Sequence, residues 1–150
     1  MADTISKEQR SKNMSAIRNK DTKPEIYLRK RLFALGLRYR KNATYIFGCP
    51  DIFIPKYKTA IFVNGCYWHR HNGCKYAYHP KSNIVFWEAK FSKNVNRDAV
   101  VREHLLSQQI KCLVVWECTV KRMKRATEFE TNTIEQILSF LKSDKLYMEL

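Results

Sequence analysis

The sequence of 150 residues contains no long apolar run, no internal repeat and no low-complexity segment. Its apolar stretches at 52–54 and 60–63 suit buried strands and are far shorter than the ~20 residues that cross a bilayer. The first 20 residues are polar and basic, without the apolar core of a signal peptide. These absences exclude a membrane span and an export signal, so we expect one soluble, cytoplasmic globular domain.

Acidic residues are scarce compared with basic ones. Lys and Arg number 28 against 14 Asp and Glu, which gives a formal charge of +14. Such a charge points to polyanionic partners, with nucleic acid first and an anionic membrane surface second. Aromatic residues lie among the basic ones, and no basic amphipathic anchor is present, so nucleic acid is the favoured partner.

Cysteine is present in an odd number, which argues against a disulfide framework in a chain without an export signal. Three possible metal ligands, Cys66, His71 and Cys74, lie within nine positions, and Cys118 follows the apolar run 112–116. Thiolates and imidazoles bind structural zinc as a set of four. The alternative is a group of buried thiols, which protein cores often contain. The cysteines are Cys49, Cys66, Cys74, Cys112 and Cys118.

Three nearby histidines compete for the fourth position of this predicted zinc site. They are His69, His71 and His79. The position of His71 next to Gly73-Cys74 allows the chain to fold back, but the spacing separates it only weakly from His69.

The predicted elements describe an α/β protein with a mixed sheet. Thr22 should cap a helix with Pro24 in its first turn, Glu25 reaching back to the cap and Gly36 ending it after Leu35. Residues 1–21 should form a basic arm, partly helical around 11–19. The other expected elements are strands at 37–40, 51–54, 59–63 and 112–116 and helices at 92–109 and around 134–141.

A carboxylate and a histidine offer a second, catalytic kind of site. Asp51 follows Pro50 at the start of a strand and suits Mg²⁺, a hard cation that prefers oxygen ligands, although an isolated Pro-Asp is usually a turn. His69 is the candidate general base, since an imidazole changes charge near neutral pH. Asp98 could orient it, or could be a solvated helix carboxylate. Glu25 is already explained by capping.

Several motifs resemble those of the bacterial very short patch repair endonucleases, in order from about residue 8 to residue 118. They are Arg10-Ser11-Lys12-Asn13-Met14, Asp21-Thr22, Glu25, Pro50-Asp51, Gly65-Cys66-Tyr67-Trp68-His69, Phe86-Trp87, Lys93-Asn94-Val95-Asn96-Arg97-Asp98 and Val114-Val115-Trp116-Glu117-Cys118.

The resemblance implies a restriction-endonuclease-like fold, with a mixed central sheet flanked by helices. It implies an enzyme that nicks duplex DNA 5′ to the thymine of a T:G mismatch, the lesion left when 5-methylcytosine deaminates. Asp51 and the main-chain carbonyl of Val63 would hold Mg²⁺, and His69 would be the general base, supported by Asp98 and Glu25. The structural zinc would be held by Cys66, His71, Cys74 and Cys118.

The resemblance also implies how DNA is held. Tyr67, Trp68 and Trp87 would form a wedge beside the mismatch. Trp116 lies in the apolar run 112–116, so we expect it to be a core residue. Met14 on the arm 1–21 would enter from the other groove. The remaining expected DNA contacts are Lys12 and Asn13. Residues 22–150 would be the endonuclease domain of a monomer, with mismatch-repair loading proteins and a repair polymerase as further partners near the bacterial nucleoid.

This sequence departs from the family pattern at four places. Asn64 stands where a second active-site His is common, Val63 where Thr is usual and Cys49 where Arg is common, and one extra residue separates His71 from Cys74. The Glu-x-Lys motif of the usual Pro-Asp nuclease arrangement does not follow the Pro-Asp strand. Two alternatives stay open: a restriction- or junction-type Mg²⁺-dependent nuclease, and a non-catalytic zinc-stabilised DNA-binding module.

Overall fold

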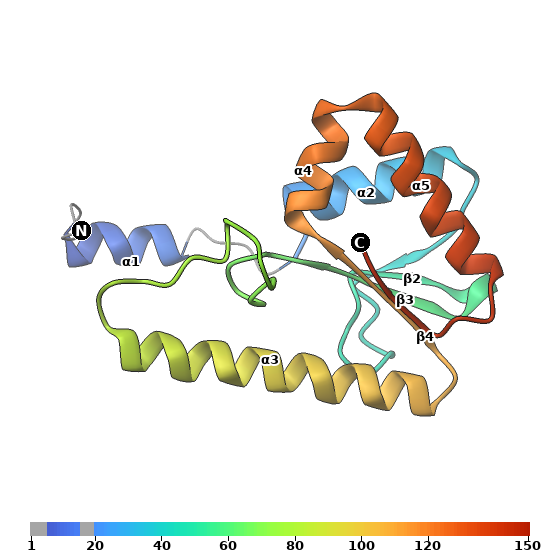
Figure 1. Ribbon diagram of the computed structural model, residues 1–150. Coiled ribbons are helices and arrows are strands. Elements are labelled where there is room, and N and C mark those ends of the chain that lie inside the picture. The colour runs from blue at the N-terminus through green and yellow to red at the C-terminus, as the bar shows by residue number, and fades with distance from the viewer. Residues whose placement is uncertain (1–5, 16–19) are drawn as a thin grey trace.

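The centre of the protein is a mixed five-stranded β-sheet, described by a computed structural model that covers residues 6–15 and 20–150 (Figure 1). Side chains at positions 10 and 13–15 fall outside the description. The strands lie in the order β1-β2-β3-β4-β5, with antiparallel pairs at β1·β2 and β2·β3 and parallel pairs at β3·β4 and β4·β5. Their bounds are β1 Arg40–Lys41, β2 Ile52–Ile54, β3 Thr59–Asn64, β4 Lys111–Trp116 and β5 Tyr147–Glu149.

Helix α2 (Lys23–Ala34) begins where the capping residues predict. The Thr22 hydroxyl accepts a hydrogen bond from the Glu25 N–H at 3.5 Å, and Pro24 stands in the first turn. The Glu25 carboxylate, however, accepts from the N–H of Asp21 rather than from that of the cap residue. Gly36 has the positive φ of 86° expected just beyond the end of the helix.

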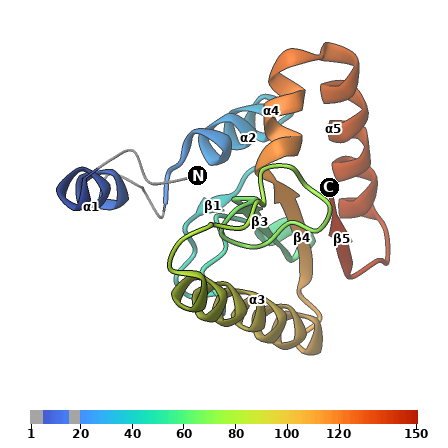
Figure 2. The same cartoon turned by 60° about the vertical axis from the view of Figure 1, so that its left-hand side comes forward.

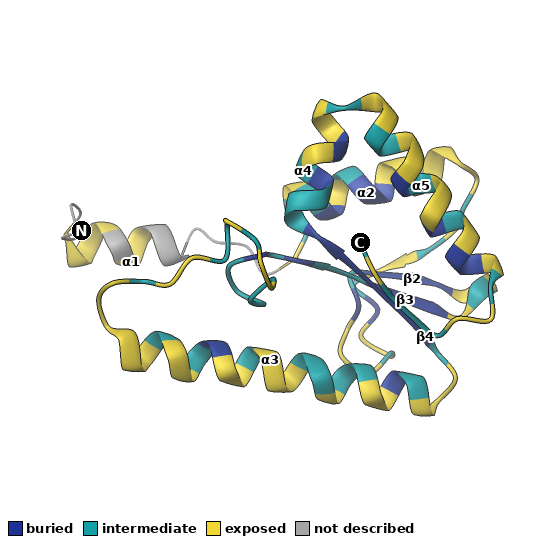
Figure 3. Cartoon of the chain, in the orientation of Figure 1, coloured by how far each residue is buried: buried dark blue, intermediate teal, exposed yellow. Residues whose placement is uncertain are grey.

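The sheet separates two apolar cores, because side chains alternate between the two faces of a strand. Ile52 and Ile61 face one way and Phe53 and Ala60 the other. The larger core packs α2, α4 (Glu117–Arg125) and α5 (Thr127–Lys142) on the first face, and α3 (Ile84–Ser107) covers the second (Figures 1 and 3). The buried helix residues of the larger core are Leu28, Leu32, Val120, Met123, Ile137, Phe140 and Leu141.

Several predicted boundaries were wrong. α3 begins at Ile84 instead of residue 92. Its first turns expose Val85 and Phe86, so the sequence has no buried apolar face there from which a helix could be predicted. The strand expected at 37–40 is reduced to β1. α4 and β5 were not predicted, and α5 begins seven residues before the expected position of 134.

The N-terminal arm carries helix α1 (Lys7–Ser15), which begins earlier than the helix expected around 11–19. Residues 16–19 of that prediction lie outside the described residues. In both views α1 lies away from the sheet and its covering helices (Figures 1 and 2). Within the described ranges, no helix combines the length and the apolar character needed to cross a membrane.

Candidate active site and metal centre

A cleft of about 1450 Å³ opens where β3 and β4 end, between α3 and the start of α2. It is lined by all four residues predicted to be catalytic, which come from different elements. Glu25 lies on α2, Asp51 precedes β2, His69 follows β3, and Asp98 lies on α3. The fold therefore gathers four distant segments around one opening.

Asp51 is held by the strand beside it. Its Oδ2 accepts a hydrogen bond from the N–H of Val63 at 2.7 Å. Burial, followed by the charge of Glu25, raises the pKa of the Asp51 carboxyl to about 7, although the Val63 hydrogen bond acts in the opposite direction. Ionising Asp51 is costly, and its charge is repelled by the second carboxylate. A bound cation would offset both effects.

The oxygen atoms around Asp51 suit a hard cation. Within the described residues the hydrogen bonds of these two carboxylates engage Asp51 Oδ2 and Glu25 Oε2, and none reaches Asp51 Oδ1 or Glu25 Oε1. The N–H and C=O of one strand residue project to the same side, so the Val63 carbonyl also lies on the Asp51 side of β3. Two carboxylates and a carbonyl, with room for water, match the ligands that Mg²⁺ prefers.

His69 and Asp98 form a pair across the cleft. His69 Nδ1 lies 2.6 Å from Asp98 Oδ2, and the two side chains are 22% and 34% exposed. Because Nδ1 is engaged, Nε2 is the ring nitrogen left for a proton transfer. The Asn94 amide donates to the main-chain carbonyl of Trp68 at 3.1 Å, which fastens the loop before His69 to α3.

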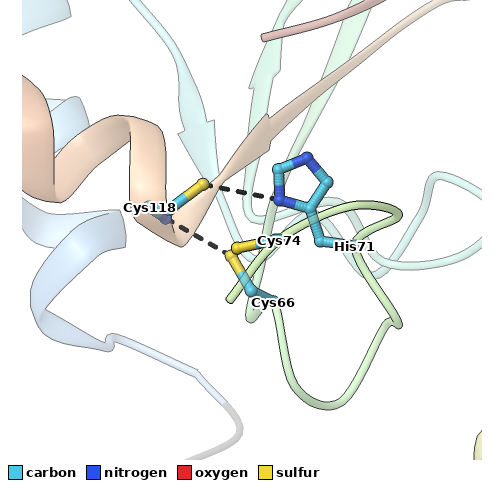
Figure 4. A group of neighbouring side chains, drawn as sticks. All are labelled: Cys66, His71, Cys74 and Cys118. Atoms are coloured by element: carbon cyan, nitrogen blue, oxygen red, sulfur yellow. Dashed lines mark hydrogen bonds between the residues drawn. The ribbon is translucent and has the colours of Figure 1, made fainter. Parts of the chain in front are cut away.

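A second site is a cluster of three thiols and an imidazole beside the cleft. Ligand atoms of Cys66, His71, Cys74 and Cys118 all lie within 4.8 Å of one another (Figure 4). Cys118 Sγ is 3.4 Å from His71 Nδ1, and the Cys118 N–H donates to Cys66 Sγ at 3.4 Å. Four such atoms can surround one ion at about 2.0–2.3 Å, so the cluster could hold a metal.

The surroundings of the cluster explain how it is shaped. The His71 ring stacks on Trp116, with centroids 4.2 Å apart and planes 4° from parallel. Trp116 is 7% exposed, as expected for a core residue. Burial raises the pKa of the Cys66 thiol to about 12 in the protein alone, so a cation is needed to make this group a thiolate. His79, one of the three histidines that competed for this site, is exposed and lies outside the cluster.

Aromatic side chains form one group that reaches the cleft at Trp68. Tyr67 contacts Trp68, Trp87 and Phe91 with ring centroids 5.1, 5.9 and 5.2 Å apart. Lys90 lies over Trp68 at 5.3 Å from its centroid. The three residues predicted as a DNA wedge are therefore brought together and are partly exposed.

The predicted arm contacts are only partly described. Lys12 is exposed on α1, whereas the side chains of Asn13 and Met14 lie outside the described residues.

Two arginines were missed by the sequence analysis. Arg29 is buried beside Glu25, and Arg70 donates to three loop carbonyls while its guanidinium lies 4.1 Å from the Phe91 centroid. The only sequence signal for Arg29 is its position on the apolar side of α2, four residues after Glu25 and one after the buried Leu28.

The departures from the family pattern lie close to these groups. Asn64 ends β3 and is 8% exposed, and Cys49 is exposed at the rim of the cleft.

Comparison with known proteins gives a consistent result. Residues 2–75 match the family model described as DNA mismatch endonuclease Vsr. The chain is 41% identical to the type II nicking enzyme V.NmeAIP of Neisseria meningitidis, over 91% of this chain and 97% of the relative. It is 49% identical to V.HpaIIP of Haemophilus parainfluenzae over 70% and 75%, respectively. It is 37% identical to the DNA mismatch endonuclease Vsr of Escherichia coli over 85% of this chain and 81% of that protein. With this cleft and these relatives, the chain belongs to the Vsr family of DNA mismatch endonucleases.

Proposed function

We propose that this protein is a Mg²⁺-dependent, restriction-endonuclease-like enzyme that nicks duplex DNA 5′ to the thymine of a T:G mismatch. Such mismatches arise when 5-methylcytosine deaminates, and the nick would start very short patch repair. One observation carries the proposal: half-buried Asp51 and buried Glu25 share a cleft with the His69–Asp98 pair. The names of the relatives, which include a mismatch endonuclease and nicking enzymes, support it.

The proposed chemistry is hydrolysis of one phosphodiester bond. Nε2 of His69 takes a proton from a water molecule, whose oxygen attacks phosphorus, and the bond to the 3′ oxygen breaks as that oxygen takes a proton from solvent water. The products are a 5′-phosphate and a 3′-hydroxyl. Asp98 holds the ring through Nδ1 and stabilises the imidazolium that forms. Mg²⁺ bound by Asp51 and the Val63 carbonyl, with Glu25 supporting the site, would offset charge that grows on the phosphate oxygens.

The mismatch would be selected through its weak stacking. Opening a mismatched step costs at most a few kcal/mol, and stacking on an aromatic ring returns ~1–3 kcal/mol per base. Tyr67, Trp68 and Trp87 would supply those rings, and the contacts of Tyr67 with both tryptophans support this role. Met14, Lys12 and Asn13 on the arm 1–21 would contact the duplex from the other side, while residues 22–150 form the catalytic domain.

The cysteine and histidine cluster is proposed to hold structural Zn²⁺. A set of three thiols and one imidazole with no open position is typical of structural rather than catalytic zinc. The protein would act as a cytoplasmic, nucleoid-associated monomer that passes its nick to mismatch-repair loading proteins and a repair polymerase.

A nicking assay with labelled T:G and matched duplexes tests the proposal. Nicking of the T:G duplex should require Mg²⁺, occur on the thymine strand only and be lost in Asp51→Ala. Equal nicking of matched DNA would instead indicate a restriction-type nuclease. Binding without any nicking would indicate a non-catalytic DNA-binding module.

A further inference from the structure

Arg29 occupies an unusual position for a charged side chain. It is only 6% exposed, on the face of α2 that points toward the cleft carboxylates. Burying a guanidinium is costly unless negative or carbonyl partners surround it. Its Nε has no hydrogen-bond partner among the described residues.

The guanidinium of Arg29 joins three segments of the chain. Nη2 donates to Glu25 Oε2 at 3.1 Å and to the main-chain carbonyl of Asp51 at 3.3 Å. Nη1 donates to Asp21 Oδ1 at 2.6 Å. Asn42 completes the group: its N–H donates to the same Asp51 carbonyl at 3.1 Å, and its side-chain amide donates to Asp21 Oδ1 at 3.2 Å.

These contacts set the orientation of both carboxylates of the proposed cation site. Glu25 Oε2 is fixed by Arg29 and by the Asp21 N–H, so its other oxygen stays available. The Asp51 backbone is fixed by Arg29 on its carbonyl, while Val63 fixes the side chain. The positive charge of Arg29 also offsets the repulsion between the two carboxylates that it contacts, through the Glu25 side chain and the Asp51 main chain.

The same contacts reach the junction with the N-terminal arm. Asp21 has a positive φ of 55°, and both its N–H and its side chain are held, by Glu25 and Arg29, respectively. Asp21, at the end of the arm, is thus held by bonds to residues of the proposed cation site and its support.

We propose that Arg29 is a positioning residue that orients Glu25 and Asp51 for the divalent cation and couples this site to the arm at Asp21. The inference rests on the proposed function. It predicts that Arg29 governs cation affinity without contacting DNA itself, because the side chain is buried. A lysine at this position could satisfy only part of the group, since an ammonium lacks the fork that engages Asp21 and Glu25 together.

The test measures Mn²⁺ affinity, from the electron paramagnetic resonance signal of the free ion, in zinc-loaded protein. Mn²⁺ binding to the proposed site is defined as the part of the total binding that is lost in Asp51→Ala. Arg29→Met should weaken it about 10- to 100-fold, as changes behind a metal ligand commonly do. Arg29→Lys should restore part of the loss, and Asp21→Ala should lose less. Arg31→Met, at an exposed arginine of the same helix paired with Glu130, is the matched control.

Two further measurements separate this role from simpler ones. The affinity for a T:G duplex without divalent cation should stay within about twofold of the wild type in Arg29→Met, whereas a phosphate-binding arginine would lose affinity. The Mg²⁺ concentration for half-maximal nicking should rise in parallel with the Mn²⁺ dissociation constant. A purely structural role would lower the melting temperature and leave both cation constants unchanged.

The outcomes are distinguishable. Wild-type Mn²⁺ affinity in folded Arg29→Met overturns the proposal, and so does an equal loss in Arg31→Met. If Arg29→Met does not fold, Asp21→Ala decides by the same criterion. Absence of Asp51-dependent Mn²⁺ binding in the wild type also overturns it. Cation binding that depends on Arg29 in a protein that never nicks DNA refutes the proposed function and leaves the role of Arg29 supported.

Discussion

Individual residues in the cleft owe their properties to neighbours that are distant in sequence. Asp51 is made costly to ionise by burial and by Glu25, 26 positions earlier, and His69 is held by Asp98, 29 positions later. Such pairs form only when α2, the β2–β3 hairpin and α3 are assembled. The chemistry of each group is therefore a property of the folded chain.

Asp51→Asn should stabilise the protein at alkaline pH without added Mg²⁺. The folded pKa, about 7, lies above the ordinary value of 3.8, so this carboxyl favours folding below pH 3.8 and loses that contribution as pH rises through 7. The variant should gain on the order of 2–4 kcal/mol of unfolding free energy at pH 8 and little at pH 4. Urea unfolding at both pH values measures this, with the exposed Asp144→Asn as control. Equal effects at the two pH values would contradict it.

His69→Ala should slow nicking at saturating Mg²⁺ and DNA by roughly 10²–10⁴-fold, the usual contribution of a general base. Asp98→Asn should slow it less, because the ring remains but loses its acceptor at Nδ1. Both should keep their affinity for the T:G duplex, as measured by fluorescence anisotropy. His79→Ala, at an exposed histidine, is the matched control, and a comparable loss there would argue against the assignment of His69.

At the scale of elements, side chains attach the long loop after β3 to the neighbouring helices. The segment after β3 is tied to the start of α4 through Cys118, and its aromatic part is tied to α3 through Arg70 and Asn94. This segment carries His69 and the candidate wedge, so its order depends on these few attachments.

Cys118→Ala should reduce bound zinc from one ion per chain and lower the melting temperature, because a structural zinc site contributes directly to folding. Atomic absorption and calorimetry measure the two quantities. Cys49→Ala, at an exposed cysteine outside the cluster, should change neither. Unchanged zinc content in Cys118→Ala would remove this residue from the ligand set.

Arg70→Met should loosen the aromatic loop. Arg70 donates to the carbonyls of Tyr67, Ala77 and Tyr78 at 3.1, 2.7 and 3.2 Å, bonds that methionine cannot make. We expect the preference for T:G over matched duplex to fall about 10-fold, equivalent to ~1.4 kcal/mol, while zinc content stays the same. Arg97→Met, at an exposed arginine of α3, should keep the preference of the wild type.

The sequence predicted the elements with strong local signals and missed those without them. Thr22, Pro24 and Gly36 mark both ends of α2, and the apolar runs of β3 and β4 are unambiguous. β5 has only three residues, and its pairing with β4 is fixed by contacts that no local pattern carries. The proposed role of Arg29 depends on partners from three segments, so the local sequence of the helix does not predict it.

Across the whole molecule, the cleft and the arm meet at one end of the sheet. Asp21, where the arm joins, lines the cleft, and α1 extends beyond it (Figure 1). The excess of basic residues gives a general attraction for the duplex, which would bring DNA to the proposed active site in the cleft.

DNA affinity should therefore fall steeply with salt. Each phosphate contact contributes about −0.9 to the slope of log affinity against log salt concentration. Lys7→Gln and Lys12→Gln on α1 should each reduce the slope by about one such contact. Lys145→Gln, exposed between α5 and β5, is the control and should leave the slope unchanged. A flat affinity from low to high salt would argue against phosphate contacts by the arm.

The parallel pairing of β3 with β4 has a consequence for biosynthesis. Residues 51–98, which include Asp51, His69 and Asp98, emerge from the ribosome first. β4 and Cys118, which complete the sheet and the metal cluster, are synthesised later. Because domains fold as the chain emerges, a nascent chain that ends before β4 holds its catalytic groups without their scaffold. We expect such fragments to leave T:G duplexes intact, so that DNA is not nicked by an incompletely synthesised enzyme.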